Sequence, residues 1–312
     1  MLIVATFITL VLALMLELLF LHPHRLKNFT WLVLWRNRLQ QLFGASAWWQ
    51  GPLGVLTVLV LPVACAAIIQ TTAFYQQWLL GFFGIIIGVL VLIYCLRYQG
   101  VDQSVEEMLR QDPKAPEVAQ DQRLGLELFG EATPTGPDRY EVMARAVLVQ
   151  ANERLFAVLF WFVILGPMGA LLYRAAWCLA RSPASSTPVV ADPFDQAVTR
   201  LYGILSWVPA RLTALGYALA GGFEEAVCQW KDVPHAEDQN FFARNDQVLA
   251  AAGVGALHLE RYTQSTEEEG QPVLKVEREA VRAAHALVLR TLLIWATLFA
   301  VVVLTILAGG SF

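Results

Sequence analysis

Polar residues stand directly against long apolar segments at several points of the chain, and their types could support binding or catalysis. The first group is Asn152-Glu153-Arg154, which comes immediately before an apolar run that begins at Leu155. An amide and a carboxylate held at a membrane surface could bind a cation or orient a polar head group. The alternative is an interfacial polar edge that only anchors the helix.

A second group is Asp192-Pro193-Phe194-Asp195. An aspartate at the N-cap, a proline at the first helical position and an acid in the first turn predict the start of a helix, which needs no ligand. The alternative is that Asp192 and Asp195 supply a pair of hard oxygen ligands for Mg²⁺.

A third group is Arg200, Ile204, Trp207 and Arg211, whose spacings of four, three and four place them on one face of a helix. Pro209 removes a backbone donor within this stretch, so we expect a kink. Two guanidinium groups and an indole beside a kink predict a cradle for an anion or phosphate. The alternative is that Arg211 extends to the membrane surface or pairs with an acid such as Glu153.

A fourth group lies at the N-terminus, where Glu17 interrupts an apolar run and is followed by His24 and Arg25. Ionisable groups inside a bilayer are costly and usually face the protein interior. We therefore expect Glu17 to form the acidic side of the same polar pocket. The alternative is that Glu17 lies near enough to the membrane surface to be solvated.

The composition indicates the class of protein. The chain has 312 residues, of which 57% are hydrophobic and only 15% are charged, and its mean hydropathy is +0.52. Soluble domains carry about 25% charged residues, so we expect an integral membrane protein. A net charge of −4 without a basic stripe argues against nucleic acid as a partner. The four cysteines are scattered and indicate neither a disulfide framework nor a zinc site.

Four apolar segments are long enough to cross a bilayer, which takes about 20 residues. They are residues 1–21, 52–71, 78–97 and 291–312. Two further segments, 155–173 and 201–223, are apolar but interrupted, the first by Gly166-Pro167 and the second by Arg211. The expected fold class is all-α: a polytopic helical membrane protein with four spans plus a membrane-embedded helical pair, which is either re-entrant or spanning.

Lysine and arginine near the span ends predict the orientation, because they favour the cytoplasmic side. The basic loop 22–51 and the acidic helical segments 98–154 and 224–288 are expected in the cytoplasm. Both termini are then expected in the periplasm of a bacterial inner membrane.

The interrupted pair is expected to enter and leave from the cytoplasmic side. A full crossing by residues 155–173 would leave three arginines in a short outer loop, which the charge rule disfavours. They are Arg174, Arg181 and Arg200. The expected division of the chain is 1–97 (three transmembrane helices), 98–154, 155–223 (the embedded pair), 224–288 and 289–312 (the last transmembrane helix).

Several strings resemble the AmpE and CobD/CbiB family of membrane proteins, and the resemblance covers nearly the whole chain. The block NERLFAVLFWFVILGPMGALLYRAAWCL is similar to the family's apolar block, which ends in a glycine–proline turn and a Tyr-Arg or Tyr-Lys pair, here Tyr173-Arg174. LSWVPARLTALGYAL, residues 205–219, looks like the family's D/N-W-(I/V)-P-A-R-L helix. Glu17 matches an acid in the family's first helix, and LFLHPHRL lies where the family has a basic turn.

The resemblance implies two alternative functions. The cobalamin branch joins an aminopropanol arm to a corrinoid carboxylate in an amide bond. Its Glu-Asn-Thr-x-x-Asp, Asp-Ser-Met and His-Pro-Ser-Pro-Asn strings are replaced here by VQANER, AAWCLARS and NFFARNDQVLA. We therefore expect an AmpE-like regulatory protein without catalysis, linked to β-lactamase induction, hence antibiotic resistance, and to cell-wall recycling. The alternative is an ATP-dependent, amide-forming synthase of the CobD/CbiB type with a degenerate site.

The expected partners are the lipid bilayer and a small anionic ligand, of nucleotide or muropeptide type, in a pocket that faces the cytoplasm. A homo-oligomer, and ATP with Mg²⁺ as cofactor, are further candidates, whereas a resident metal site is not expected. The expected ligand-binding residues are Glu17, His24, Arg25, Asn152, Glu153, Arg154, Arg174, Asp192, Asp195, Arg200, Trp207 and Arg211.

Overall fold

A computed structural model describes most of the chain. The described residues are 2–19, 29–44, 46, 48–75, 80–96, 139–181, 192–233, 241–259 and 273–309. Across these residues the regular structure is helical throughout, without a β-strand, as the sequence predicts. His24, Arg25 and most of the predicted segment 98–154 lie outside the described residues.

The chain divides into two compact units, and each is described by itself. Unit 1 consists of Met1–Arg97, Glu153–Pro209 and Val302–Phe312, and unit 2 consists of Tyr98–Asn152 and Ala210–Val301. The Asn152-Glu153 pair and the predicted Arg200–Arg211 face are therefore each divided between the units.

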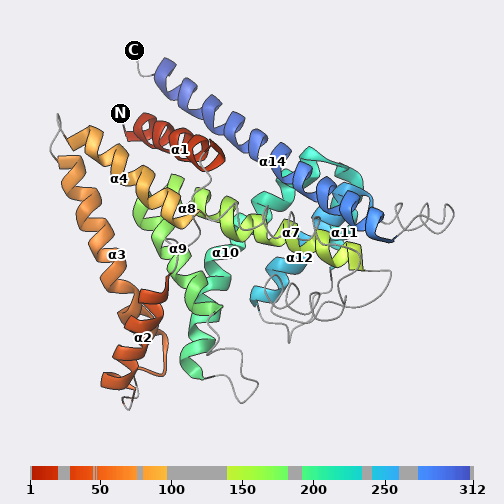
Figure 1. Cartoon of the computed structure of the whole chain (residues 1–312). Helices are drawn as coiled ribbons and strands as arrows, with labels where there is room; N and C mark the ends of the chain where they lie inside the picture. Colours follow the sequence, from red (N-terminus) through yellow and green to blue (C-terminus); the bar gives the residue numbers. More distant parts are fainter. Residues whose placement is uncertain are drawn as a thin grey trace. The chain divides into compact units, whose positions relative to one another are not determined.

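Unit 1 is built around α4 (Leu80–Cys95), which packs against α1 (Leu2–Leu19), α3 (Pro52–Tyr75) and α9 (Pro167–Ala180) (Figure 1). Buried apolar side chains of these helices, such as Val58, Leu92 and Ala176, form the core of the unit. The side chains of α3 and α4 are mostly apolar on every face of each helix. This is typical of helices that face lipid or a protein interior rather than water.

The segment expected as a basic loop at 22–51 contains α2 (Thr30–Phe43), which packs on α3 and α9. Its buried residues Leu32, Arg36 and Leu39 are spaced by four and three, so they form one face of the helix. An amphipathic helix of 14 residues is too short to be found in a search for membrane spans, which explains why the sequence did not predict it.

The predicted interruption at Gly166-Pro167 is confirmed, because α8 (Ala157–Leu165) ends there and α9 begins at Pro167. Gly166 has φ +72° and ψ −156°, a conformation that is essentially confined to glycine. The side chain of Gln70 bridges the break: its Nε2 donates to the carbonyl of Leu165 at 3.3 Å, and its Oε1 accepts from the amide of Met168 at 3.4 Å.

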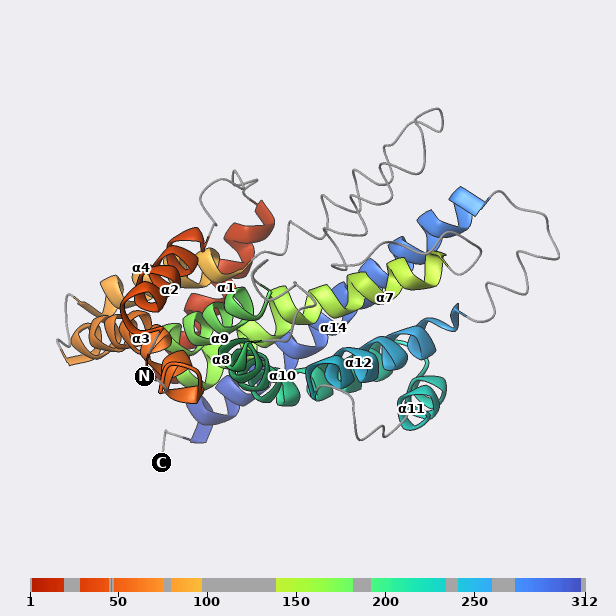
Figure 2. The same cartoon turned by 90° about the horizontal axis from the view of Figure 1, so that it is seen from below.

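Unit 2 is built around α12 (Phe241–Leu257), which packs against α7 (Arg139–Ala151) and α11 (Phe223–Lys231) (Figure 2). Gly255 allows the close approach of α12 to α11, since a Cβ atom there would lie 2.6 Å from the carbonyl oxygen of Glu225. The hydroxyl of Tyr217 donates to the carbonyl of Leu148 at 2.9 Å and ties α10 to α7.

Helix α10 (Pro193–Ala220) begins at Pro193, directly after Asp192, which confirms the predicted helix start. It continues through Pro209, and its residues from Ala210 onward belong to unit 2. Most of α14 (Val273–Gly309) also belongs to unit 2, and the predicted boundary at residue 288 falls inside this continuous helix.

Two helical stretches are long and apolar enough to cross a membrane: Glu141–Leu165 and Glu279–Ala308. The apolar window of the second is only 17% buried and exposes Leu293, Leu298 and Leu304. Shorter apolar helices cover Pro52–Ile68 and Gly84–Cys95. These features support a helical membrane protein, whereas the number and orientation of the spans remain predictions.

Candidate functional site

Asn152 and Glu153 lie in a π-helical turn, Asn152–Phe156, that joins α7 to α8. Such turns contain one extra residue and occur frequently at functional sites. Both side chains are almost completely buried, each with 1% exposure, although neighbouring residues of a regular helix point in different directions. Ala157 and Val158 of the regular helix that follows are buried as well, so this polar string is internal rather than an exposed edge of the apolar helix.

In unit 1, the carboxylate of Glu153 accepts hydrogen bonds from three side chains, which come from α9, from the residue directly after α9 and from α10. Arg181 Nη2 lies 2.6 Å and the Tyr202 hydroxyl 3.2 Å from its Oε1, while Trp177 Nε1 lies 3.1 Å from its Oε2. The Tyr202 hydroxyl also lies 3.2 Å from that of Tyr173. We call these five residues the Glu153 cluster. It links the π-turn to α9 and α10 through a charge-assisted network.

Arg174 lies on the same face of α9 as Trp177, and Arg181, directly after the helix, continues the spacing of three and four. Its side chain is 1% exposed, and its guanidinium carbon lies 3.9 Å from the centre of the Trp177 ring and 6.0 Å from that of Phe29. A guanidinium over an indole face is a favourable cation–π arrangement. This predicted site residue is therefore part of the aromatic interior of unit 1.

Asp195 forms an ion pair with Arg36 of α2, whose Nη2 donates to its Oδ1 at 2.8 Å. Arg36 also lies 4.9 Å over the ring of Phe194, which stacks on Trp49 at 5.4 Å. Burial raises the pKa of Asp195, and the charge of Arg36 opposes that shift.

Asp192 and Asp195, the alternative pair of Mg²⁺ ligands, do not fit this geometry. The carboxylate of Asp195 forms an ion pair with Arg36, whereas Asp192 is exposed. Within the described ranges, no group of three or more His, Cys, Asp and Glu side chains could hold a metal ion. The helix start is thus the role of this string that the structure supports.

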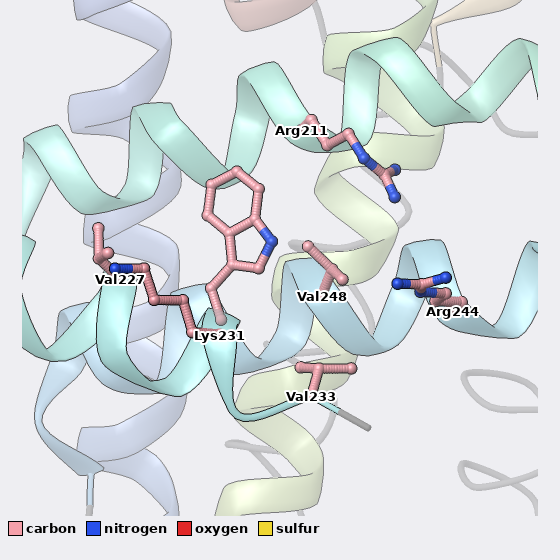
Figure 3. A pocket seen from close by; sticks show the side chains of 7 residues that line it. Arg211, Val227, Lys231, Val233, Arg244 and Val248 are labelled. Atoms are coloured by element: carbon pink, nitrogen blue, oxygen red, sulfur yellow. The ribbon is translucent and has the colours of Figure 1, made fainter. Parts of the chain in front are cut away.

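In unit 2, Arg211 lines a pocket of 460 Å³, which we call the Arg211 pocket (Figure 3). Arg211 comes from α10, and the other lining residues come from α11, α12 and the turn after α11. Of the seven described lining residues, three are cationic, one is a tryptophan, three are valines and none is acidic. The lining residues are Arg211, Val227, Trp230, Lys231, Val233, Arg244 and Val248.

The guanidinium of Arg211 is held by Asn245, whose Oδ1 accepts from Nη1 at 2.7 Å. Asn245 is 1% exposed and lies next to Arg244 on α12. Figure 3 shows the guanidinium groups of Arg211 and Arg244 at the same end of the pocket, with Lys231 at the other. The Nε atom of Arg244 is buried and has no hydrogen-bond partner among the described residues.

Of the residues on the predicted face of Arg200, Trp207 and Arg211, only Arg211 lines the Arg211 pocket. Trp207 is 42% exposed, Arg200 is also exposed, and neither lines the Arg211 pocket. The cationic groups that accompany Arg211 come from α11 and α12, which are distant in sequence. A pattern confined to one helix could not reveal them.

The other predicted residues are placed as follows. Asn152, in unit 2, accepts a hydrogen bond from the buried hydroxyl of Thr213 at 3.0 Å. Arg154 is half-buried in the π-turn. Glu17 belongs to α1, but its side chain is not among those that the structure describes. That Glu17 forms the acidic side of a polar pocket therefore stays a prediction.

Sequence reasoning missed Arg181, Trp177 and Tyr202 around Glu153, and Arg244 and Asn245 around Arg211. One signal for the first set was available, since Arg174, Trp177 and Arg181 share a helical face. By itself, the string that contains Arg244 and Asn245 indicates only a departure from the His-Pro-Ser-Pro-Asn pattern.

Comparison with protein families shows to which family the chain is related. The family described as CobD/Cbib protein matches residues 10–288. The chain belongs to the CobD/Cbib family. The match includes the Glu153 cluster and the whole Arg211 pocket, so both lie in the part of the chain that defines the family.

Individual relatives of this CobD/Cbib chain match over shorter stretches. "Cobalamin biosynthesis protein CobD" of Chromobacterium violaceum is 35% identical over 112 residues, which are 36% of this chain and 34% of the relative. The protein of the same name in Stutzerimonas stutzeri is 35% identical over 121 residues, 38% of each chain. The chain thus covers little more than a third of either relative. No solved structure matches it.

Proposed function

We propose that this chain is a membrane-bound synthase of cobalamin biosynthesis that forms an amide bond and binds a phosphate-bearing substrate in the Arg211 pocket. The observation that carries the proposal is the family match over residues 10–288, which includes a pocket with three cationic side chains. The names of the two relatives support the pathway. Of the two functions expected from the sequence, the synthase is thus better supported than the AmpE-like regulator.

The Arg211 pocket suits the anionic part of such a substrate or of ATP. Arg211, Arg244 and Lys231 would bind phosphate oxygens by charge-assisted hydrogen bonds, and Trp230 offers an aromatic face to a base. If ATP is bound, it would supply the phosphoryl group that activates the carboxyl group of the substrate and leaves as phosphate when an amine attacks. Because Asp195 is paired with Arg36, any Mg²⁺ would enter with the nucleotide rather than on Asp192 and Asp195.

The localisation belongs to the same proposal. We place the chain in the bacterial inner membrane, with the Arg211 pocket on the cytoplasmic side and both termini in the periplasm. The arginine and lysine distribution supports this orientation, because the segments rich in these residues stay in the cytoplasm.

An assay of the purified protein tests the proposal. Detergent-solubilised protein is incubated with a corrinoid carboxylic acid, aminopropanol or its phosphate ester, and ATP with Mg²⁺, and the amide product is followed by mass spectrometry. We expect product formation that falls at least tenfold in Arg211→Ala, whereas Arg200→Ala, which lies outside the pocket, keeps wild-type activity. Folded protein that forms no amide with either amine would overturn the proposal.

A second candidate is the AmpE-like regulator, which binds an anionic ligand without catalysis. One observation favours it: Glu153, the acid nearest to the family's acidic string, already accepts three hydrogen bonds from its own chain. A deletion strain separates the two functions. Loss of cobalamin-dependent growth supports the synthase, and a changed β-lactamase induction with normal cobalamin supports the regulator.

A further inference from the structure

Like charges gather at one end of the Arg211 pocket. Arg211 extends from α10 and Arg244 from α12, and Figure 3 shows their guanidinium groups on facing sides of the same opening. Among the lining residues that the structure describes, none is acidic. Bringing two cations together in a partly buried pocket costs free energy, and a bound anion would offset this cost.

One support of Arg211 is a neutral group, the side-chain amide of Asn245. Asn245 is 1% exposed and accepts from Arg211 Nη1 at 2.7 Å, which limits the guanidinium to one orientation. An amide oxygen can fix an arginine in this way without adding a negative charge. A carboxylate at the same position would form an ion pair with Arg211 and compete with any anionic ligand.

We propose that Asn245 is a positioning residue that holds Arg211 toward Arg244, so that the two guanidinium groups bind one phosphoryl group between them. Planar guanidinium groups match the oxygens of a phosphoryl group better than a point charge does. Arg244 itself lines the pocket, and its Nε is buried without a hydrogen-bond partner among the described residues.

The rest of the pocket indicates the class of ligand. Beyond the two arginines, the lining consists of Trp230, Lys231 and three valines, so the organic part of the ligand meets a mainly apolar surface with an aromatic face. A phosphate ester with a flat or apolar body, such as a nucleotide, fits this lining. The inference rests on the proposed function for the presence of a phosphate-bearing substrate, but binding can be measured without turnover.

Calorimetric titration of the purified full chain with ADP tests the inference, with adenosine and inorganic phosphate as companion probes. The variants are Asn245→Asp, Asn245→Ala and Arg244→Gln. The matched control is Tyr217→Phe, which removes another buried hydrogen bond of unit 2 outside the pocket. Melting temperatures are recorded for every variant.

We expect wild type to bind ADP and, more weakly, phosphate, but not adenosine. Asn245→Asp and Arg244→Gln should each weaken ADP binding at least tenfold, with Asn245→Asp losing more than Asn245→Ala. Tyr217→Phe should bind ADP like wild type even if its melting temperature falls. If Asn245 acted only in folding, ADP affinity would follow the melting temperature in both variants. Asn245→Asp and Tyr217→Phe would then lose affinity only to the extent that they lose stability.

Three outcomes would overturn the inference: equal binding of adenosine and ADP, wild-type affinity in Asn245→Asp, or wild-type affinity in Arg244→Gln. Should the Asn245 variants not fold, Arg244→Gln still decides the phosphoryl site, because Arg244 lies on the pocket wall and is less buried than Asn245. ADP binding that depends on these residues in a protein without synthase activity would support the phosphoryl site while contradicting the proposed function. Amide formation with ADP binding insensitive to them would do the reverse.

Discussion

Trp161 of α8 donates its indole N–H to the carbonyl oxygen of Leu205 in α10 at 3.0 Å. This carbonyl lies four residues before Pro209, which has no backbone N–H to donate to it. The indole N–H therefore takes the place of the backbone donor that Pro209 lacks. The Leu205 carbonyl keeps a hydrogen bond, and α10 continues through Pro209. The W-x-P-A-R-L helix is thus completed by a tryptophan from a different helix of unit 1.

Replacing this tryptophan should destabilise the protein. Trp161→Phe leaves the Leu205 carbonyl without its donor, and we expect a loss of about 1–3 kcal/mol in unfolding free energy, the usual cost of an unsatisfied buried polar group. Pro209→Ala restores a backbone donor, so it should recover part of the loss in the Trp161→Phe background. Denaturant unfolding in detergent measures all three variants. Equal losses with and without Pro209→Ala would contradict this pairing.

Glu153 should be the most sensitive carboxylate in unit 1. Glu153→Ala leaves the partly exposed guanidinium of Arg181 and two further donors without their common acceptor, and we expect a loss of about 1–3 kcal/mol, the usual cost of unsatisfied buried donors. Arg181→Met in the same background should recover part of this loss.

The control for this prediction is the more exposed pair of Glu141 and Arg145, one helical turn apart on α7. Glu141→Ala should cost about 0.5 kcal/mol or less, as exposed pairs of this spacing usually do. A Glu153→Ala variant as stable as Glu141→Ala would show that the Glu153 cluster contributes little to folding.

The sequence predicted those parts of the fold that depend on local pattern. Apolar runs indicated α1, α3 and α4, Gly166-Pro167 indicated the break after α8, and Asp192-Pro193 indicated the start of α10. Each of these features depends on residues that are neighbours in the chain. The number of membrane spans does not follow from such patterns, because buried and lipid-facing apolar helices have similar compositions.

The candidate site was less predictable because its contacts join distant segments. Arg181 and Tyr202 follow Glu153 by 28 and 49 residues, and Asn245 follows Arg211 by 34. Spacing on one helix selected Arg211, which lines the pocket, but grouped it with Arg200 and Trp207, which do not. Only the packing of α12 brings Arg244 and Asn245 to Arg211.

Gly255 should be essential for the packing that forms the Arg211 pocket. A methyl group there would lie 2.6 Å from the carbonyl oxygen of Glu225 and 2.8 Å from the Cα of Ala226, both in the backbone of α11. We expect Gly255→Ala to cost about 1–3 kcal/mol, as overpacking usually does, and to weaken ADP binding as α11 moves. Thermal unfolding and titration measure the two effects.

Gly51 provides the matched control for Gly255, since a methyl group at Gly51 would meet nothing closer than 4.0 Å. Gly51→Ala should therefore change the unfolding free energy by about 0.5 kcal/mol or less. Similar effects of the two substitutions would mean that backbone contact between α11 and α12 does not limit the stability of unit 2.

The orientation of the interrupted pair can be tested by cysteine labelling. Arg181 pairs with Glu153, yet the charge rule counts arginine and lysine residues rather than net charge, so Arg174, Arg181 and Arg200 still favour the cytoplasm. In a protein without its native cysteines, single cysteines are placed at Thr72 and Ser185, and intact cells are treated with a membrane-impermeant maleimide. Thr72→Cys should react at once, whereas Ser185→Cys should react only after the membrane is permeabilised. Reaction of both in intact cells would mean that residues 155–173 and 201–223 cross the membrane fully, and reaction of Ser185→Cys alone would mean that the whole orientation is reversed.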